Sequence, residues 1–230
     1  TTDDPAVTIR IGDDGPVLTV AVKGGATLAL NLDESIVSGG STSDESGTIA
    51  AGSDDTLLTA PNGVDPFGHT QTASGAISGL FEDTTADAGT DGQKSRSDVY
   101  SLALTGATGT AMAAATTFAA AQGLATTLSI TDASNAYVSD TIYLFKISDT
   151  VIEGRVDLNN DGMFNDVNGV ALRFTLDLAS PSNPVLKVDQ ILALDHPTVA
   201  DHDEAVSLAI AGPDLHALAG IGVTKSSTLT

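Results

Sequence analysis

Four short strand-like segments, joined in pairs by tight turns, constrain the fold of this chain most. They span residues 142–147, 151–156, 170–178 and 185–194. The last two alternate apolar and polar residues, and this period of two puts apolar side chains on one face, as in half-buried antiparallel strands. Residues 148–150 (SDT) make a tight turn in the first pair, and residues 180–184 (SPSNP) form the loop of the second. We therefore predict two consecutive β-hairpins.

The rest of the chain indicates the same fold class. Further short strands are predicted at residues 7–11, 17–22, 26–32, 76–81, 99–104, 126–130, 206–210 and 215–223. Residues 33–75 and 82–98 are polar and aperiodic, which indicates long surface loops. The Ala-rich stretch 111–122 precedes a glycine and predicts either a short helix or a low-complexity loop. Together these features predict an all-β, mainly antiparallel β-sandwich with long calcium-pinned loops and at most one or two short helices. Residues 1–11 are interpreted as the tail of a preceding unit or a linker, and residues 12–230 as one domain.

The charge balance excludes several classes of partner. Thirty acidic side chains against nine basic ones give a formal charge of −21. Such a chain has no basic surface to neutralise phosphates, which excludes nucleic acid, and an anionic membrane would repel it. No run of 18 apolar residues is present, so direct membrane insertion is not expected. There are no cysteines, which removes disulfides and cysteine-ligated metals. Because uncompensated charge opposes compaction, we expect bound divalent cations; a halophilic surface would have a similar composition.

The sharpest motif for chemistry is the run DLNNDGMFND at residues 157–166. Oxygen-bearing side chains alternate and then reach Gly162, as in calcium loops, because alternation aims the oxygens at one point and glycine permits the bend. The predicted ligands are the side chains of Asp157, Asn159 and Asp161, the carbonyl of Met163, and Asp166 or Asn165. The twelfth position is Asn168 rather than Glu and the preceding segment is predicted as a strand, so we expect a calcium turn between strands, not an EF-hand. The alternative is an Asn/Asp-rich turn without metal.

Three further acidic clusters are weaker candidates for calcium. The second cluster contains Asp195, Asp201, Asp203 and Glu204; the third contains Glu82, Asp83, Asp87 and Asp91; the fourth contains Asp13, Asp14, Asp33, Glu34, Asp44 and Glu45. His196 and His202 near the second cluster suggest zinc or a general base, but the hard oxygen donors around them suit calcium better. A solvated acidic loop is an equal alternative there. The fourth cluster could hold a cation between this domain and its predecessor.

No motif for catalysis is present in the chain. It has no G-x-S-x-G elbow, no phosphate-binding P-loop and no dinucleotide fingerprint. Acidic pairs are so common that no single pair points to glycosidase chemistry. We therefore expect that the protein is not an enzyme.

An ordered set of motifs resembles a domain of giant repeats-in-toxin (RTX) adhesins, which are type I-secreted surface proteins of Gram-negative bacteria. The motifs are GDDGP at residues 12–16, LDES at 32–35, VYSLAL at 99–104, VIEGRV at 151–156, LALDHP at 192–197 and DEAVSL at 203–208. The resemblance covers residues 11–223, and the order of the motifs carries it more than any one of them. The chain departs from the pattern at residues 111–121 and 134–141.

The resemblance implies an extracellular domain on the bacterial cell surface, exported by type I secretion and exposed to millimolar calcium. In the first hypothesis, the domain binds a protein or peptide on another cell surface, in cell adhesion and biofilm formation. A calcium ion with an open position would capture a carboxylate such as a peptide C-terminus, beside a groove lined by Tyr137 or Tyr143. In the alternative, the domain is a structural extender or scaffold rigidified by calcium. Either way we expect a monomer that contacts neighbouring domains of its own chain.

Overall fold

A computed structural model describes residues 17–24, 68–87, 95–106, 108–130, 141–192, 194 and 220–229. The strands are β1 (Val17–Val22), β2 (Gly68–Gln71), β3 (Phe81–Asp87), β4 (Arg96–Leu104), β5 (Leu124–Ser129), β6 (Thr141–Lys146), β7 (Val151–Arg155), β8 (Val170–Asp177), β9 (Val185–Gln190) and β10 (Ile221–Leu229). Two 3-10 turns, η1 (Ser78–Leu80) and η2 (Ala120–Gln122), are the helical elements of the described residues. All strand pairs are antiparallel, so the predicted all-β class is confirmed.

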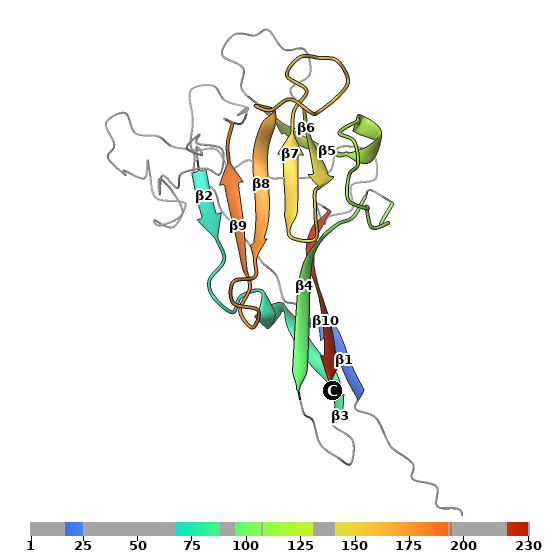
Figure 1. Cartoon of the computed structure of the whole chain (residues 1–230), viewed down its shortest axis with the longest axis vertical. Helices are drawn as coiled ribbons and strands as arrows, with labels where there is room; N and C mark the ends of the chain where they lie inside the picture. Colours follow the sequence, from blue (N-terminus) through green and yellow to red (C-terminus); the bar gives the residue numbers. More distant parts are fainter. Residues whose placement is uncertain are drawn as a thin grey trace, which may run out of the picture.

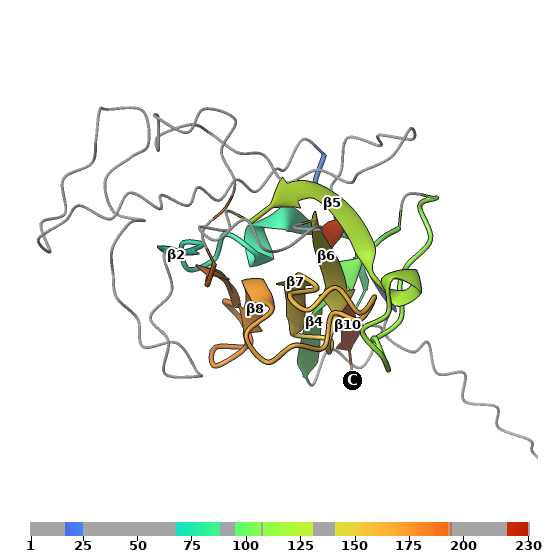
Figure 2. The ribbon, with the colours of Figure 1, turned by 90° about the horizontal axis from the view of Figure 1, so that it is seen from above.

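Six strands form the body of the molecule, in the order β2-β9-β8-β7-β6-β5 (Figure 1). The two predicted hairpins are its centre: β6 pairs with β7, and β8 pairs with β9. An isolated bridge between Ile130 and Leu194 brings the chain after β5 beside the chain after β9. The sheet therefore curls across its width, as the view from above shows (Figure 2). This curl makes the architecture sandwich-like rather than flat.

Two ribbons, β1–β3 and β4–β10, extend from the body as a stalk (Figure 1). Val17 pairs with Asp87 and Leu229 pairs with Arg96, and these pairs lie at the stalk tip, the end of the ribbons remote from the six-stranded sheet. The upper part of β4 reaches the body, where the Leu102 N–H donates to the Asp149 carbonyl at 2.6 Å. The described chain thus enters through β1 and leaves through β10 at the same end of the molecule.

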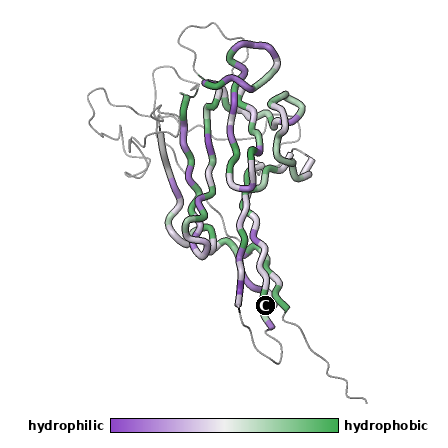
Figure 3. The backbone as a smooth tube through the Cα atoms, viewed as in Figure 1, coloured by the Kyte–Doolittle hydropathy of each residue, from purple (hydrophilic) through white to green (hydrophobic). Residues whose placement is uncertain are grey.

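The core lies between one face of the curled sheet and the upper part of β4. The sheet contributes alternate buried side chains from each central strand, and Figure 3 shows this alternation along the chain. Tyr100, Leu102 and Leu104 of β4 join the same cluster, together with Ile77. Since the aromatic content is low, aliphatic side chains supply most of the buried apolar area. No helix of the described residues is long and apolar enough to span a membrane.

Several sequence-based expectations are wrong. Residues 82–87 form part of strand β3, not a loop; all six are exposed, so no apolar alternation marks the strand. At 111–122, where the sequence predicts a short helix or a low-complexity loop, the structure has an irregular loop that ends in η2, so the loop alternative is confirmed. Residues 76–80 form a turn and η1 rather than a strand, and β10 continues to Leu229 through polar residues.

Several expectations fall outside the described residues. These are the predicted strands at 7–11, 26–32 and 206–210. In the stretch predicted as a long loop, 33–75, the structure describes residues from 68 onward, and they contain strand β2, which pairs with β9. This edge strand carries the polar sequence GHTQ, which gives no hydrophobic periodicity to recognise.

Gly154, inside strand β7, leaves too little space for an added methyl group. A Cβ there would lie 2.9 Å from Ile142 Cγ2 and 3.2 Å from Leu172 Cβ. We expect Gly154→Ala to lower the free energy of unfolding by about 1–3 kcal/mol, because the close-packed core must shift. Gly222→Ala is the matched control, since a Cβ there meets no atom within 4 Å. Urea denaturation measures both; equal stabilities of the two variants would contradict the packing at Gly154.

Candidate functional site

The predicted calcium loop joins β7 to β8 at the end of the sheet opposite the stalk tip (Figure 1). The loop stands out as a hydrophilic segment above the sheet (Figure 3). Asn160 has φ 54° and Gly162 has φ 82°, so the chain makes two left-handed bends within three residues. The Val156 N–H donates to Gly169 O at 2.8 Å, which closes the base of the loop. The sequence therefore predicted both the position of this turn and its glycine bend.

The side-chain oxygen atoms of this loop accept hydrogen bonds from the loop's own backbone N–H groups. Asp157 Oδ1 and Asn159 Oδ1 both accept the Asp161 N–H, at 3.1 and 3.0 Å. The Gly162 N–H donates to Asp157 Oδ2 at 2.7 Å, and Asp161 Oδ1 accepts the Met163 N–H at 2.8 Å. Asp157 is only 5% exposed although it carries a charge. Two side chains that share one N–H donor lie close enough to act on one point.

Asp166 completes the ring of oxygen donors from the far side of the loop. Its Oδ2 accepts the Leu158 N–H at 3.1 Å, and its Oδ1 accepts Asn159 Nδ2 at 3.2 Å. Within the described part of the chain, no three His, Cys, Asp or Glu side chains form a group that could hold a metal ion. The carboxylates are instead engaged with N–H groups of the loop. Their oxygens are of the hard type that calcium prefers in proteins.

An aromatic cluster lies under the loop, on the outer face of the sheet, which is the face opposite the core. The Phe164 ring from the loop lies 4.5 Å from the Tyr143 ring and 5.6 Å from the Phe145 ring, between centroids. The Phe118 ring contacts Phe145 edge-on at 5.4 Å. Phe145 is fully buried by these neighbours. Tyr143, predicted to line a groove, is thus packed against the loop, while Tyr137 lies outside the described residues.

Arg155 connects this aromatic cluster to a buried ionic triad. Its guanidinium carbon lies 4.1 Å from the centre of the Phe118 ring, and its Nη1 donates to Phe164 O at 3.1 Å. On its other side it forms an ion pair with Glu153 at 2.7 Å, and Arg173 forms a second one with the same carboxylate at 2.9 Å. Sequence reasoning missed the triad. The sequence signal for the triad is the pair Glu153 and Arg155. They are two residues apart, so in a strand both charges lie on the same face.

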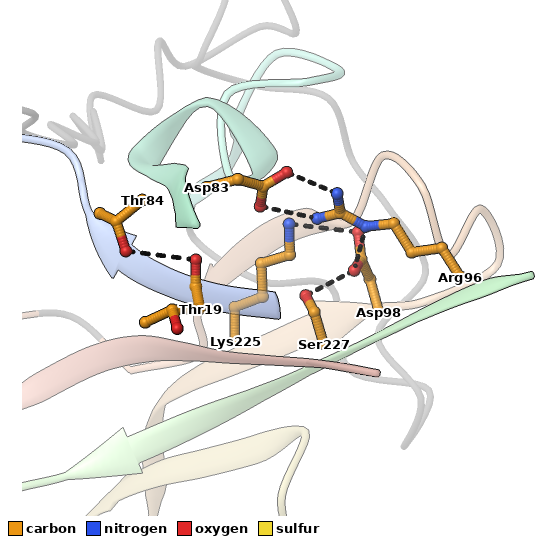
Figure 4. A network of polar contacts seen from close by, with 7 residues as sticks. All are labelled: Thr19, Asp83, Thr84, Arg96, Asp98, Lys225 and Ser227. Atoms are coloured by element: carbon orange, nitrogen blue, oxygen red, sulfur yellow. Dashed lines mark hydrogen bonds and ion pairs between the residues drawn. The ribbon is translucent and has the colours of Figure 1, made fainter. Parts of the chain in front are cut away.

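Asp83, of the third predicted cluster, belongs to a network of polar contacts in the stalk (Figure 4). Both Asp83 oxygens accept hydrogen bonds from Arg96, at 2.6 and 3.0 Å. Arg96 Nε also donates to Asp98 at 2.8 Å, and Asp98 receives further contacts from Lys225 at 3.1 Å and Ser227 at 2.6 Å. The Asp83 carboxylate therefore already has a cationic partner. The network ties ribbon β1–β3 to ribbon β4–β10.

Asp87, also of the third cluster, pairs with Val17 in the register of the stalk and is exposed. The remaining predicted ligands fall outside the described residues: Asp91, Asp13, Asp14, Glu34, Asp195, Asp201, Asp203 and Glu204. The loop at 157–166 is thus the one predicted cluster whose members the structure describes completely.

Acid is expected to weaken the stalk through Asp98. Burial raises the pKa of this carboxyl, but hydrogen bonds from Arg96, Ser227 and Lys225 outweigh it and lower the pKa to about 2, from an ordinary value of 3.8. The stabilisation, about 2 kcal/mol, is therefore present above pH 3.8 and is lost as the pH falls toward 2. Melting temperatures of the parent and Asp98→Asn should differ at pH 5 and converge near pH 2. A difference that stays constant over this range would contradict the assignment.

Comparison with known proteins identifies a family. No curated protein and no solved structure matches the chain. The family described as "Domain of unknown function (DUF5801)" matches residues 29–219, which is most of the chain. This range contains the whole six-stranded sheet, the loop at 157–166 and the aromatic cluster below it. The protein therefore belongs to the DUF5801 family.

Proposed function

We propose that this chain is a calcium-dependent ligand-binding domain of a large bacterial surface adhesin, working outside the cell in adhesion and biofilm formation. The observation that carries the proposal is the loop at 157–166. It gathers oxygen donors around a buried Asp157, at the free end of the sheet. The ordered RTX-like motifs and the charge of −21 support calcium as the ion and the cell surface as the location.

The candidate ligands have distinct roles in holding a cation. Asp157 and Asn159 would supply two oxygens from one side, because both already point at the same N–H group. Asp161 and Asp166 would add charge, and Met163 a carbonyl. A bound calcium ion supplies positive charge and an exchangeable coordination position that a carboxylate can occupy. The chain itself keeps Asp157 buried and the loop base closed, which pre-organises the donors.

The positions of the two chain ends favour a domain that displays a ligand-binding loop over the alternative, an extender in line with its neighbours. An extender that holds other modules away from the cell needs its two chain ends at opposite ends of the domain. Here β1 begins and β10 ends at the stalk tip, and the loop lies at the other end (Figure 1). A domain with this topology projects its loop away from the line of neighbouring domains. This arrangement suits contact with a ligand on another cell.

Asp161→Asn tests the ion site while preserving the turn. The amide oxygen can still accept the Met163 N–H, which is the side-chain bond that Asp161 makes in the loop, but one negative charge is lost. We expect calorimetric calcium titration to give an affinity at least about tenfold lower for this site, because affinity depends on the number of charged ligands. Asp149→Asn, in an exposed turn, is the control with the same loss of charge. Identical titrations for parent and Asp161→Asn would make the loop a metal-free turn.

A peptide array tests ligand binding separately from ion binding. The same peptides are synthesised with a free C-terminal carboxylate and with a C-terminal amide, and both sets are probed with the domain in calcium and in EDTA. We expect signal in calcium on the free carboxylates only, since an amide lacks the charge that an open calcium position attracts. Calcium binding by calorimetry with no calcium-dependent array signal would favour the extender.

A further inference from the structure

Asn168 and Gly169 connect the loop at 157–166 to strand β8, and two backbone hydrogen bonds hold Gly169 in place. Its N–H donates to Asp166 O at 3.1 Å, which closes a tight turn over residues 166–169, and its carbonyl accepts the Val156 N–H at 2.8 Å. A Cβ at this position would lie 2.7 Å from Val156 O. The packing at the base of the loop therefore requires a glycine after Asn168.

Asn168 is exposed, and among the asparagines of the described residues it is the only one followed by glycine. The others precede a residue with a side chain or a proline: Asn159, Asn160, Asn165 and Asn183. Glycine has no side chain to screen its main-chain nitrogen, so this nitrogen can reach the side-chain amide of the preceding asparagine. We propose that Asn168 is a site of spontaneous deamidation, and that the isoaspartate formed there opens the base of the loop. The inference goes beyond the proposed function and does not depend on a bound ion.

The reaction consumes water and releases ammonia, with no oxidation or reduction. The main-chain nitrogen of Gly169 loses its proton to hydroxide and attacks Cγ of Asn168. The N–Cγ bond forms, the Cγ–Nδ2 bond breaks, and Nδ2 takes up a proton from water and leaves as ammonia. Water then hydrolyses the cyclic imide at one of its two carbonyls. Cleavage at Cγ gives aspartate, and cleavage at the main-chain carbonyl gives isoaspartate, in which the chain runs through Cβ and Cγ.

Isoaspartate at position 168 would change both the charge and the length of the main chain. A carboxylate replaces a neutral amide, so the net charge goes from −21 to −22. One additional methylene enters the chain directly before Gly169, which displaces it from its partners Asp166 and Val156. Val156 is only 1% exposed, and a buried N–H without an acceptor is costly. The base of the loop would therefore open until water reaches this N–H group.

The fold controls how fast the reaction proceeds. The Gly169 N–H must leave Asp166 O before its nitrogen can attack, so reaction in the folded domain follows local opening of the turn. A synthetic peptide of residues 164–172 has no such restraint. We expect the peptide to deamidate about tenfold or more faster than the same site in the folded domain, while the folded domain still converts measurably.

Peptide mapping by mass spectrometry, after incubation of the full chain in mildly alkaline buffer, tests the chemistry. We expect conversion at Asn168 to two products that co-elute with synthetic peptides containing aspartate and isoaspartate. Asn183 is the internal control, because it is also exposed but precedes Pro184, whose nitrogen carries no proton to lose. Asn183 should stay unmodified. The sequence has a second Asn–Gly pair at residues 62–63, so each change is assigned from its peptide and not from the total charge.

Amide hydrogen exchange tests the structural consequence, on the isoaspartate form separated from the parent by anion exchange. The reporter is the Val156 amide, and the control is the Thr72 amide, which donates to Leu186 O at 2.9 Å in another part of the fold. We expect exchange at Val156 to accelerate about tenfold or more and exchange at Thr72 to change much less. Asn168→Asp is the matched control, since it has the same added charge but an ordinary main chain, and its Val156 exchange should stay close to that of the parent.

Asn168→Gln removes the reaction while keeping an amide side chain. Among the described residues, Asn160 is the one non-glycine residue with positive φ, so position 168 accepts glutamine without backbone strain. Its longer side chain must close a larger ring, which is slower. After the same incubation, position 168 of this variant should be unmodified and its Val156 exchange unchanged.

Each failure has a different signature. Conversion in the peptide but none at Asn168 of the folded chain would show that the turn protects the site completely, which overturns the proposal. Conversion with unchanged Val156 exchange would overturn the opening of the loop base. Equal acceleration in Asn168→Asp would assign the effect to charge and overturn the role of the added methylene. Equal acceleration at Val156 and Thr72 would mean global destabilisation, which overturns a local opening.

Discussion

Addition of EDTA is expected to lower the melting temperature of this domain substantially. An ion that binds only the folded state stabilises it by about 2.7 kcal/mol per site at hundredfold excess over its Kd. For a domain of this size, that corresponds to about 5–10 °C for each site lost. The loop at 157–166 is one proposed site, and any site among the predicted acidic clusters outside the described residues would add to the shift. Differential scanning calorimetry in calcium and in EDTA measures it.

Matched salts separate site binding from general screening of the negative charge. Sodium chloride at equal ionic strength screens all surface charges alike, so it should not restore the melting temperature at millimolar concentrations. Magnesium should restore it only partly, because it requires a smaller, near-ideal octahedral shell. An unchanged melting temperature in EDTA would refute the calcium proposal. Restoration by sodium alone would point to a halophilic type of stabilisation.

Glu153→Gln is expected to be the most damaging charge substitution in the body of the protein. The side chain of Glu153 is buried and balances two arginines, Arg155 and Arg173, whose own side chains are only 14% exposed. The amide keeps the shape but leaves two buried cations without a counter-charge. We expect a loss of about 3 kcal/mol of unfolding free energy, or about 6–12 °C in melting temperature. Urea denaturation and thermal melting both measure this effect.

Glu82→Gln is the control, since it makes the same chemical change at an exposed position of β3. Net charge falls in magnitude from 21 to 20 in both variants, and less self-repulsion would by itself favour folding. The two variants should therefore diverge, with Glu82→Gln within about 0.5 kcal/mol of the parent. Equal stability of both would show that the triad contributes no net stabilisation. Loss of Glu153 should also disturb Phe118, because the Arg155 guanidinium lies 4.1 Å from the centre of its ring.

The hairpins could be predicted because their signals are local. The turn at 148–150 and the loop at 180–184 each lie between two strands. The apolar residues of those strands mark which face is buried. Strand β3 could not be predicted in the same way, because its residues 82–87 are all exposed and its partner β1 is about sixty residues earlier. The pairing of β10 with β4 likewise joins segments more than a hundred residues apart. Pairing between strands so far apart in the chain leaves no signal in the local sequence.

The loop was also predictable, but its surroundings were not. Alternating oxygen donors before Gly162 mark the bend whatever lies around it. The aromatic cluster, in contrast, needs Phe118 from the stretch 111–122, Phe145 from β6 and Phe164 from the loop. The ionic triad needs the register that puts Glu153 opposite Arg173. For the Ala-rich stretch 111–122 the sequence left a short helix and a loop open, because propensity alone does not register the contacts of Ala115 and Ala119 with other parts of the fold.

The common end of β1 and β10 also determines how the domain would carry tension. A pull on the chain before Val17 and after Leu229 acts across the stalk tip, and the shortest load path never crosses the six-stranded sheet. The first contacts to resist are Arg96 with Asp83 and Asp98 with Lys225. Ribbons loaded from one end separate one rung at a time, at low force. The six-stranded sheet and the far loop would stay unstrained while the stalk opens, so the stalk would act as a compliant element under tension.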